Sequence, residues 1–265
     1  ASWTDATLTT ANLVNGRNYN FYTRVIDNAT NTTAIANPWT IGYDATAPSG
    51  GSVSSPNAVQ ASTSITVTVA PGTDGASGMS ANNGDYLLEY EAKPYAAGSC
   101  TAFTGTTWVD ASVAETAAAT SYTFTGASGN CYRFRYTVKD NVGNPTTYTD
   151  ATNATKIDTT TPDIVAVTAG PSSANRTSLT SNVWFNYIQT GSDGKVSHGW
   201  TAATSPSGST YYYVLNGTSG AFISTGGETG VVNTASAFFD SAVVLAEGTQ
   251  YFHVRPKNNA GTWGT

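Results

Sequence analysis

Apolar and polar residues alternate along several short stretches of the chain. In residues 64–70 the apolar side chains of Ile65, Val67 and Val69 occupy every second position, and residues 134–139 alternate in the same way. A period of two residues is the pattern of a β-strand with one buried face. Residues 86–90, 183–189 and 211–215 indicate further strands, and no stretch keeps a helical period. The pattern therefore predicts an all-β protein.

One of these strands belongs to a motif that occurs three times. Residues 21–31, 134–144 and 252–262 align without gaps, and in each a Phe is followed six residues later by Asp or Asn. An Asp-Xaa-Thr-Xaa-Pro linker recurs at 44–48 and 158–162, and a Gly-Xaa-Asp-Gly loop recurs at Asp74 and Asp193. Three markers in one order with one period indicate a tandem array of units of about 115 residues.

The repeats divide the chain into three predicted domains. Residues 1–44 hold only the C-terminal strands of a β-sandwich repeat, 45–158 form a full repeat, and 159–265 form a repeat that lacks its last strand. Two interpretations stay open. The chain is a piece of a longer array, or neighbouring subunits complete the broken sandwiches by donating strands to unpaired sheet edges.

The repeated residues resemble a known group of modules. The Phe-Xaa-Tyr-Xaa-Val strand, the Asp-Asn-Xaa-Gly-Asn turn and the Asp-Thr-Thr-Xaa-Pro linker are similar to bacterial immunoglobulin-like and fibronectin type III-like repeats of large extracellular surface proteins. The resemblance implies tandem β-sandwiches in an adhesin, stalk or cell-surface filament. Two positions depart from it: Pro256 interrupts a strand, and Thr30 replaces the turn glycine, so that turn is expected to differ.

Composition agrees with an extracellular location. Only 11% of the residues are charged and the net charge is −6, which argues against nucleic-acid binding. No apolar stretch is long enough for a membrane span. Cys100 and Cys131 are expected to form a disulfide in an oxidising compartment, the alternative being two free buried thiols. Candidate N-glycosylation sequons begin at Asn28, Asn31, Asn153, Asn175 and Asn216.

The repeated acids are the best candidates for a metal site. Asp44 and Asp158 precede the linker prolines, and Asp27 and Asp140 lie in the repeated turns. Carboxylates and backbone carbonyls suit calcium, so we expect calcium at the module junctions from Asp27, Asp44, Asp140 and Asp158. The alternative is that these residues form Asx turns, in which the side chain bonds to the local backbone.

A second candidate site is a Gly-flanked loop at 194–209. It contains His198, which is expected to be an exposed polar residue, and Trp200, the best candidate for an exposed aromatic side chain that binds a ligand. The alternative is that Trp200 packs in a core. No catalytic motif occurs in the chain, and residues that repeat once per module are explained by the module rather than by one active site.

Three functions follow from these patterns. The leading hypothesis is a non-catalytic structural or adhesive array on a microbial cell surface, whose partners are neighbouring repeats, surface glycans or other cells. The second is a filament or sheath subunit that shares strands between incomplete sandwiches. The third is a carbohydrate-binding accessory module, which requires a row of exposed aromatic side chains.

Overall fold

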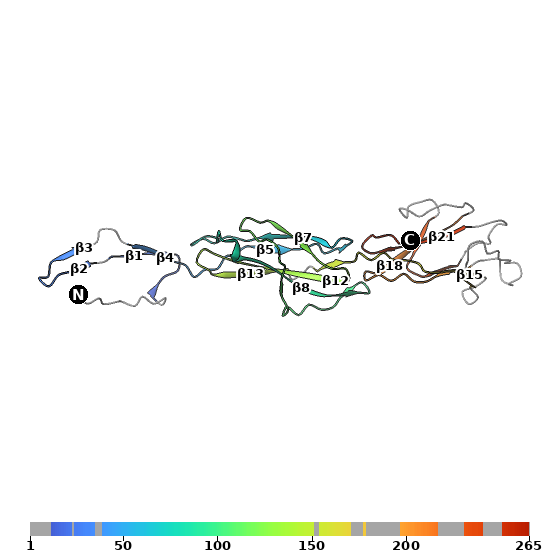
Figure 1. Ribbon diagram of the computed structural model, residues 1–265, viewed down its shortest axis with the longest axis horizontal. Helices are drawn as coiled ribbons and strands as arrows, with labels where there is room; N and C mark the ends of the chain where they lie inside the picture. Colours follow the sequence, from blue (N-terminus) through green and yellow to red (C-terminus); the bar gives the residue numbers. More distant parts are fainter. Residues whose placement is uncertain are drawn as a thin grey trace.

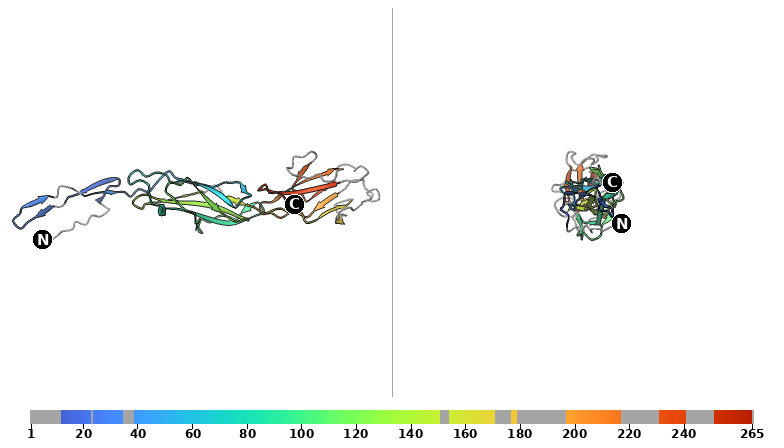
Figure 2. Two further views of the ribbon diagram at one scale, coloured as in Figure 1. Left: turned by 45° about the horizontal axis from the view of Figure 1, so that its top comes forward. Right: turned by 90° about the vertical axis from the view of Figure 1, so that its left-hand side faces the viewer.

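The chain is an elongated all-β protein. The computed structural model describes residues 12–22, 24–34, 39–150, 154–170, 177–178, 197–216, 231–240 and 251–264. Three parts follow one another along the long axis, and the end-on view has a narrow outline (Figures 1 and 2). We call them the N-terminal segment (1–44), the middle segment (45–158) and the C-terminal segment (159–265). The predicted fold class, tandem β-sandwiches, is confirmed.

Most strands are short, and the longest are β8 and β12 of the middle segment, with 11 and 10 residues. The N-terminal segment has β1 (Arg17–Phe21), β2 (Arg24–Ile26), β3 (Thr32–Ala34) and β4 (Trp39–Tyr43). The middle segment has β5 (Ser52–Ser54), β6 (Val59–Gln60), β7 (Ser64–Ala70), the 3₁₀ turn η2 (Asn83–Asp85), β8 (Tyr86–Ala96), β9 (Ser99–Cys100), β10 (Val109–Asp110), β11 (Ser121–Thr125), β12 (Asn130–Lys139), β13 (Pro145–Thr149) and β14 (Thr155–Ile157). The C-terminal segment has β15 (Val167–Gly170), β16 (Thr177–Ser178), β17 (Ser197–Trp200), β18 (Ser209–Asn216), β19 (Val232–Thr234), β20 (Phe238–Asp240) and β21 (Tyr251–Asn258).

Two sheets pack face to face in the middle segment. One has the order β10-β8-β12-β14-β6, with β13 also on β12 and β9 on β8, and the other has the order β11-β7-β5. The alternating residues face inward as predicted, because Ile65, Val67 and Val69 of β7 are buried and the residues between them are exposed. Ring contacts join the sheets, with Phe124 of β11 lying 5.2 Å from Phe134 of β12. This core holds the segment together.

The N-terminal segment repeats part of that architecture. β1 pairs with β4 in the register Arg17↔Tyr43, and β12 pairs with β14 in the register Asn130↔Ile157. Each pair is offset from the other by 113 or 114 residues, which is the sequence period. β1 and β4 are therefore the counterparts of the start of β12 and of β14.

The described strands of the C-terminal segment form two sheets, with the orders β16-β15-β17-β20 and β19-β18-β21. Pro256 lies within β21, opposite Tyr211 of β18. Among the described residues β21 is an edge strand, where a residue without a backbone N–H is tolerated. No described sheet combines strands of two segments.

The three repeated turns have the same hydrogen bonds. The backbone N–H groups of Asp27, Asp140 and Asn258 each donate to the carbonyl oxygen four residues later. The expectation that the turn with Thr30 differs was wrong. Thr30 adopts a φ of 68°, in the left-handed region where Gly143 and Gly261 have 95° and 93°. Hydrogen bonding of the turn, rather than the glycine, decides the backbone conformation.

Within the described part of the chain, none of the helices is sufficiently long and apolar to span a membrane.

Candidate functional site at the joints between segments

The first joint lies where the N-terminal segment passes into the middle segment. Asp44 directly follows β4, Asp74 lies in the loop after β7, and Asp140 lies in the turn after β12. Oxygen atoms of these three carboxylates all lie within 4.8 Å of one another. Of the acids predicted for calcium, the joint thus brings together Asp44 and Asp140, and it adds Asp74 from the repeated Asp-Gly loop.

Hydrogen bonds from the middle segment hold the linker of this joint in place. Asn144 Nδ2 donates to the carbonyl oxygens of Asp44 and Thr46, at 3.3 and 3.4 Å. The hydroxyl of Thr146 donates to the carbonyl oxygen of Pro48 at 2.7 Å. The linker therefore lies along the turn between β12 and β13.

The carboxylates of the first joint also accept hydrogen bonds from the backbone. Ser77 N donates to Asp44 Oδ2 at 2.9 Å, and Gly78 N donates to Asp74 Oδ1 at 2.8 Å. Hydrogen bonds from Ser77 and Thr46 hold the pKa of Asp44 below its usual value. Burial raises the pKa of Asp140, but hydrogen bonds from Asn144 and the turn outweigh it, so that pKa is also low. All three acids form the Asx turns of the alternative interpretation.

The second joint, between the middle and C-terminal segments, uses a buried carboxylate. Asp158 Oδ2 accepts hydrogen bonds from the hydroxyls of Ser205 and Ser207 and from Ser207 N at 2.9 Å. Asn258 Nδ2 donates to the carbonyl oxygen of Thr160 at 2.8 Å. Burial raises the pKa of Asp158, and the serine donors lower it by more, so the pKa is below its usual value.

The bodies of two segments also touch at the second joint. Gly98 N, in the turn between β8 and β9, donates to the carbonyl oxygen of Pro206 at 2.9 Å. Asn259 Nδ2 donates to the carbonyl oxygen of Ser207, as Asn141 Nδ2 donates to that of Ser77 in the first joint. The two joints thus share one design, in which a linker Asp accepts from a Ser of the following segment.

The two joints differ in how well they suit a cation. The first gathers three carboxylates, a donor set of hard oxygens that fits calcium. In the second, Asn258 takes the place of Asp140, and the counterpart of Asp74 lies outside the described residues. The carboxylate of Asp158 accepts from two serine hydroxyls and from two backbone N–H groups. Its negative charge is already compensated by hydrogen bonds. The calcium prediction therefore stays a prediction, and the chemistry supports it at Asp44 and Asp140 rather than at Asp158.

Asp27 lies away from both joints, in the turn between β2 and β3 at the far end of the N-terminal segment (Figure 1). Its carboxylate accepts from Ala29 N, Asn31 N and Asn31 Nδ2, at 2.8–2.9 Å. No other acid of the described residues joins it in a metal-binding group. Asp193 lies outside the described residues.

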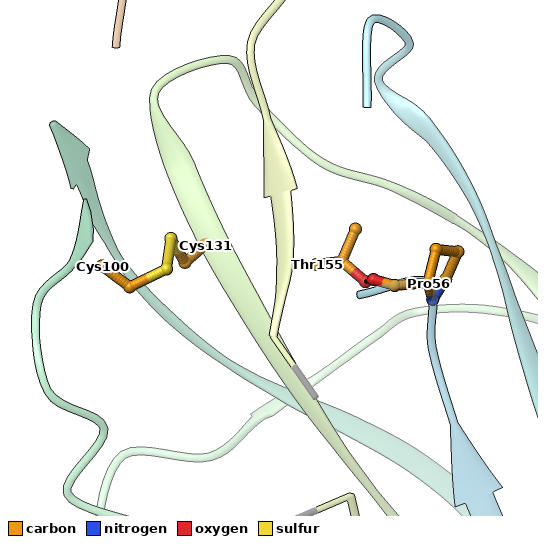
Figure 3. The surroundings of a disulfide bond; sticks show 4 residues. All are labelled: Pro56, Cys100, Cys131 and Thr155. Carbon is orange, nitrogen blue, oxygen red and sulfur yellow. Dashed lines mark hydrogen bonds between the residues drawn. A yellow bond between two sulfur atoms is a disulfide. The ribbon is translucent and has the colours of Figure 1, made fainter. Parts of the chain in front are cut away.

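A disulfide joins Cys100 to Cys131 in the middle segment, as predicted. It links β9 to β12, with a Cα–Cα distance of 5.9 Å (Figure 3). Beside it, the hydroxyl of Thr155 donates to the carbonyl oxygen of Pro56 at 2.7 Å. The pair of free thiols is therefore excluded for these residues.

Glu91 is a structural residue that the sequence analysis missed. It lies on the face of β8 opposite the core, yet it is fully buried beneath the loop 101–108. Its carboxylate accepts from Gly105 N at 2.9 Å, from Thr104 N at 3.1 Å and from Arg133 Nη2 at 2.9 Å, and it pairs with Lys93 at 3.0 Å. Burial raises the pKa of Glu91, but these donors lower it by more, to about 2.

Aromatic rings cover the cations beside this carboxylate. The guanidinium of Arg133 lies 5.0 Å from the ring of Phe103, and those of Arg133 and Arg135 lie 5.4 and 4.8 Å from the ring of Trp108. Arg135 also forms a two-pronged ion pair with Glu89. We call the contacts of Glu91 with this loop the Glu91 clamp. Its signal in the sequence is an acid that alternates with cations on the outer face of two paired strands.

The candidate ligand residues His198 and Trp200 do not lie in an exposed loop, and Trp200 follows the alternative interpretation of packing. Both residues lie in β17 and are buried. The ring of His198 stacks on that of Phe252 at 4.2 Å, and Trp200 packs against Tyr211 at 5.4 Å. Burial of aromatic area between two sheets outweighs the local Gly and Ser residues that suggested a loop.

The predicted glycosylation sequons fall in different places. Asn28 and Asn31 are exposed in the turn between β2 and β3. Asn216 ends β18. Asn153 and Asn175 lie outside the described residues. Glycosylation itself stays a prediction.

No protein-family model and no curated protein matches the chain. Among solved structures, the chain is similar to the crystal structure of the FN1-FN3 domains of chicken CNTN1, at 12% identity and a TM-score of 0.29. That match covers 96% of this chain and 76% of the other. At this TM-score the match carries no argument about the fold or the function of this chain.

Proposed function

We propose that this chain is a non-catalytic, extracellular structural array of a microbial surface protein, with repeats at 1–44, 45–158 and 159–265. The observation that carries the proposal is the pair of joints, in which each linker is bound by the segment that follows it. A flexible connection would leave its backbone to water, and relative motion of domains is the default where contacts are few. Here hydrogen bonds to Asp44 and Asp158 hold each linker against the following segment. Linkers held in this way suit a spacer that extends from a surface.

The extracellular part of the proposal rests on chemistry. Disulfides such as Cys100–Cys131 form and persist in oxidising compartments, and they are rare in the reducing cytosol. The low charge of the chain makes its behaviour nearly independent of salt. Attachment to a microbial surface and an adhesive role toward glycans or other cells are parts of the same proposal.

Small-angle X-ray scattering tests the spacer role. If the array is stiff, the maximum dimension of the wild-type chain should be nearly the same as that of a chain whose joints are held by covalent cross-links. Variants Asn144→Ala and Ser207→Ala, which loosen the first and the second joint, should shorten the average dimension. Thr137→Ala, on the outer face of β12, is the matched control and should change nothing. A wild-type chain that is already as compact on average as the variants would overturn the proposal.

A filament subunit is the second candidate function, and a specific observation favours it. Large apolar side chains of β1 and β4 are exposed, as expected for an incomplete sandwich. Association of the purified chain that grows with concentration would support it. A carbohydrate-binding module loses its best candidate residue, because Trp200 is buried.

A further inference from the structure

The two strands β1 and β4 form a ladder with one apolar face. Tyr19 lies opposite Ile41 and Phe21 opposite Trp39, and Tyr43 lies at the end of the same face, opposite Arg17. We call these five residues the β1–β4 apolar face. Trp39 is 80% exposed, Ile41 54% and Phe21 37%, although they are large apolar side chains. No described residue of the chain covers them.

The other side of the ladder is polar. It carries Asn18 and Asn20 of β1 and Thr40 and Gly42 of β4. The hydroxyl of Thr40 donates to Asn20 Oδ1 at 2.7 Å. The polar side of this ladder is thus suited to contact with water, and the apolar side is suited to burial against another surface.

The middle segment indicates what such a face packs against. Its counterpart strands are paired in the same register, and their equivalent residues Tyr132, Phe134 and Ile157 are at most 5% exposed. The sheet β11-β7-β5 covers them. Phe124 of β11 lies 5.1 Å from the ring of Tyr132 and 5.2 Å from that of Phe134. Tyr132 and Phe134 are the equivalents of Tyr19 and Phe21.

Energetics also require a partner for this face. A two-stranded sheet is marginally stable in water unless a hydrophobic face packs against something else. Contiguous exposed apolar side chains on a soluble protein mark an interaction surface. The exposed area of Trp39, Ile41 and Phe21 is of that kind.

We propose that the β1–β4 apolar face is a docking surface for an apolar β-sheet of the β11-β7-β5 kind. The partner is a polypeptide segment with Ile, Val and Phe at alternating inward positions, placed so that a Phe equivalent to Phe124 contacts Tyr19 and Phe21. The proposal does not depend on the spacer role, since it concerns the packing of one segment and not the stiffness of the joints.

Thiol labelling tests the proposal at a single position. Ile41→Cys places a thiol on the apolar face, and Thr40→Cys places one on the polar face one residue away. The two native cysteines do not react, because they are joined in a disulfide. In the full chain both new thiols should react rapidly with a maleimide. The partner is then supplied by joining a second copy of residues 45–129, which carry β5 to β11, ahead of Ala1. The added copy carries Cys100→Ser, because it lacks the partner Cys131 and would otherwise bring a free thiol.

In this extended chain the thiol of the Ile41→Cys variant should react at least about tenfold more slowly, because labelling then requires local opening of a packed sheet. The thiol of the Thr40→Cys variant should react as before. Phe124→Asp in the added copy alone should restore the fast reaction at position 41. Equal labelling at position 41 with and without the added copy would overturn the proposal. Slow labelling of position 41 in the original chain would also overturn it. Slow labelling at every concentration would mean that the same chain covers the face, and slow labelling only at high concentration would mean that a second copy covers it.

Discussion

Backbone N–H groups in the turns and joints of this chain are bound by side-chain oxygens of Asp and Asn. Asp27 and Asp140 bind the N–H groups of residues two and four positions later in their own turns, and Asn258 Oδ1 binds the N–H of Thr262. Asp158 does the same for Ser207 across a joint. A carboxylate that accepts several such bonds is stabilised in its charged form. Short polar side chains therefore determine the local conformation where strands end.

Thr30 is a residue whose replacement should stabilise the protein. Its φ of 68° places Cβ against the backbone, whereas the equivalent Gly143 has no such conflict. Thr30→Gly should raise stability by up to about 1 kcal/mol, the strain relieved less the flexibility that glycine adds to the unfolded chain. Amide hydrogen exchange of residues 29–31 measures it.

The reverse change is the control. Gly143→Ala meets no atom within 4 Å of its new Cβ, so only its φ of 95° disfavours it. It should cost about 1–2 kcal/mol. If both changes leave exchange unaltered, the left-handed conformation is not a source of strain in these turns.

Glu91 should be essential for the loop 101–108. Glu91→Gln removes the charge that Lys93 and Arg133 compensate, and it should cost roughly 3 kcal/mol, as for a broken buried ion pair. Glu89→Gln on the same strand is the matched control and should cost less than about 1 kcal/mol, because its pair with Arg135 is partly exposed. Urea unfolding of the middle segment measures both. Equal losses would mean that the buried carboxylate is not special.

At the scale of elements, the joints follow one plan with two chemistries. Each linker Asp follows the last strand of its segment and is bound by a loop and a turn of the next segment. Among the described residues, the first joint gathers three carboxylates, and in the second hydroxyl and backbone N–H donors compensate the charge of Asp158. Acid and cations should therefore act on different joints.

Acid should loosen the second joint. The pKa of Asp158 is lowered from 3.8 in the folded chain, so its contribution is complete above about pH 4 and is lost as the pH falls through the folded pKa. Asp158→Ala should remove this contribution to stability at every pH. The substitution should cost about 1–3 kcal/mol, because the donors are left without an acceptor. Thermal unfolding as a function of pH measures this. A cost of Asp158→Ala that stays the same at pH 7 and pH 2 would contradict the assignment.

At the scale of the whole molecule, three parts in series behave as a rod only if both joints hold. The second joint has a direct contact between segment bodies, at Gly98 and Pro206. The first joint acts through its linker, whose ends are bound by Asn144 and Thr146. The stiffness of the first joint should therefore depend on how firmly its linker is held.

Calcium should act on the first joint alone. We expect binding with a dissociation constant on the order of 10⁻⁴–10⁻³ M, as in extracellular modules with few carboxylates. Titration calorimetry and the scattering dimension measure it, and Asp74→Asn should abolish the response. Asp158→Asn is the control and should leave it unchanged. With no heat from the wild-type chain, the three acids serve as Asx turns only.

Removal of the disulfide should destabilise the middle segment. Cys100→Ala together with Cys131→Ala should cost about 2–4 kcal/mol, because the bridge closes a long loop in the unfolded chain. Urea unfolding in the absence of reductant measures it. Addition of reductant to the wild-type chain should give the same loss, and a much smaller loss would show that the clamp at Glu91 holds the loop without the bridge.

The sequence by itself predicted several of the strands and the period of their repeat, and the strand predicted at 183–189 lies outside the described residues. The alternation in β7 and β12 is local, so it could be read without knowing what the strands contact. The 113–118-residue period identified the turns at Asp27, Asp140 and Asn258, and the cysteine spacing within one repeat identified the disulfide.

Only the tertiary structure decided which of these residues are buried and which acids meet. Trp200 and His198 have loop-like neighbours in the sequence, but a second sheet covers them. Glu91 has the outward position of a solvated residue, but the loop 101–108 folds over it, and Arg133, 42 residues away, pairs with it. Asp44 meets Asp74 and Asp140, 30 and 96 residues away, because the linker lies along the next segment. Burial and charge clustering depend on partners that are far away in the sequence, and a local pattern contains no information about those partners.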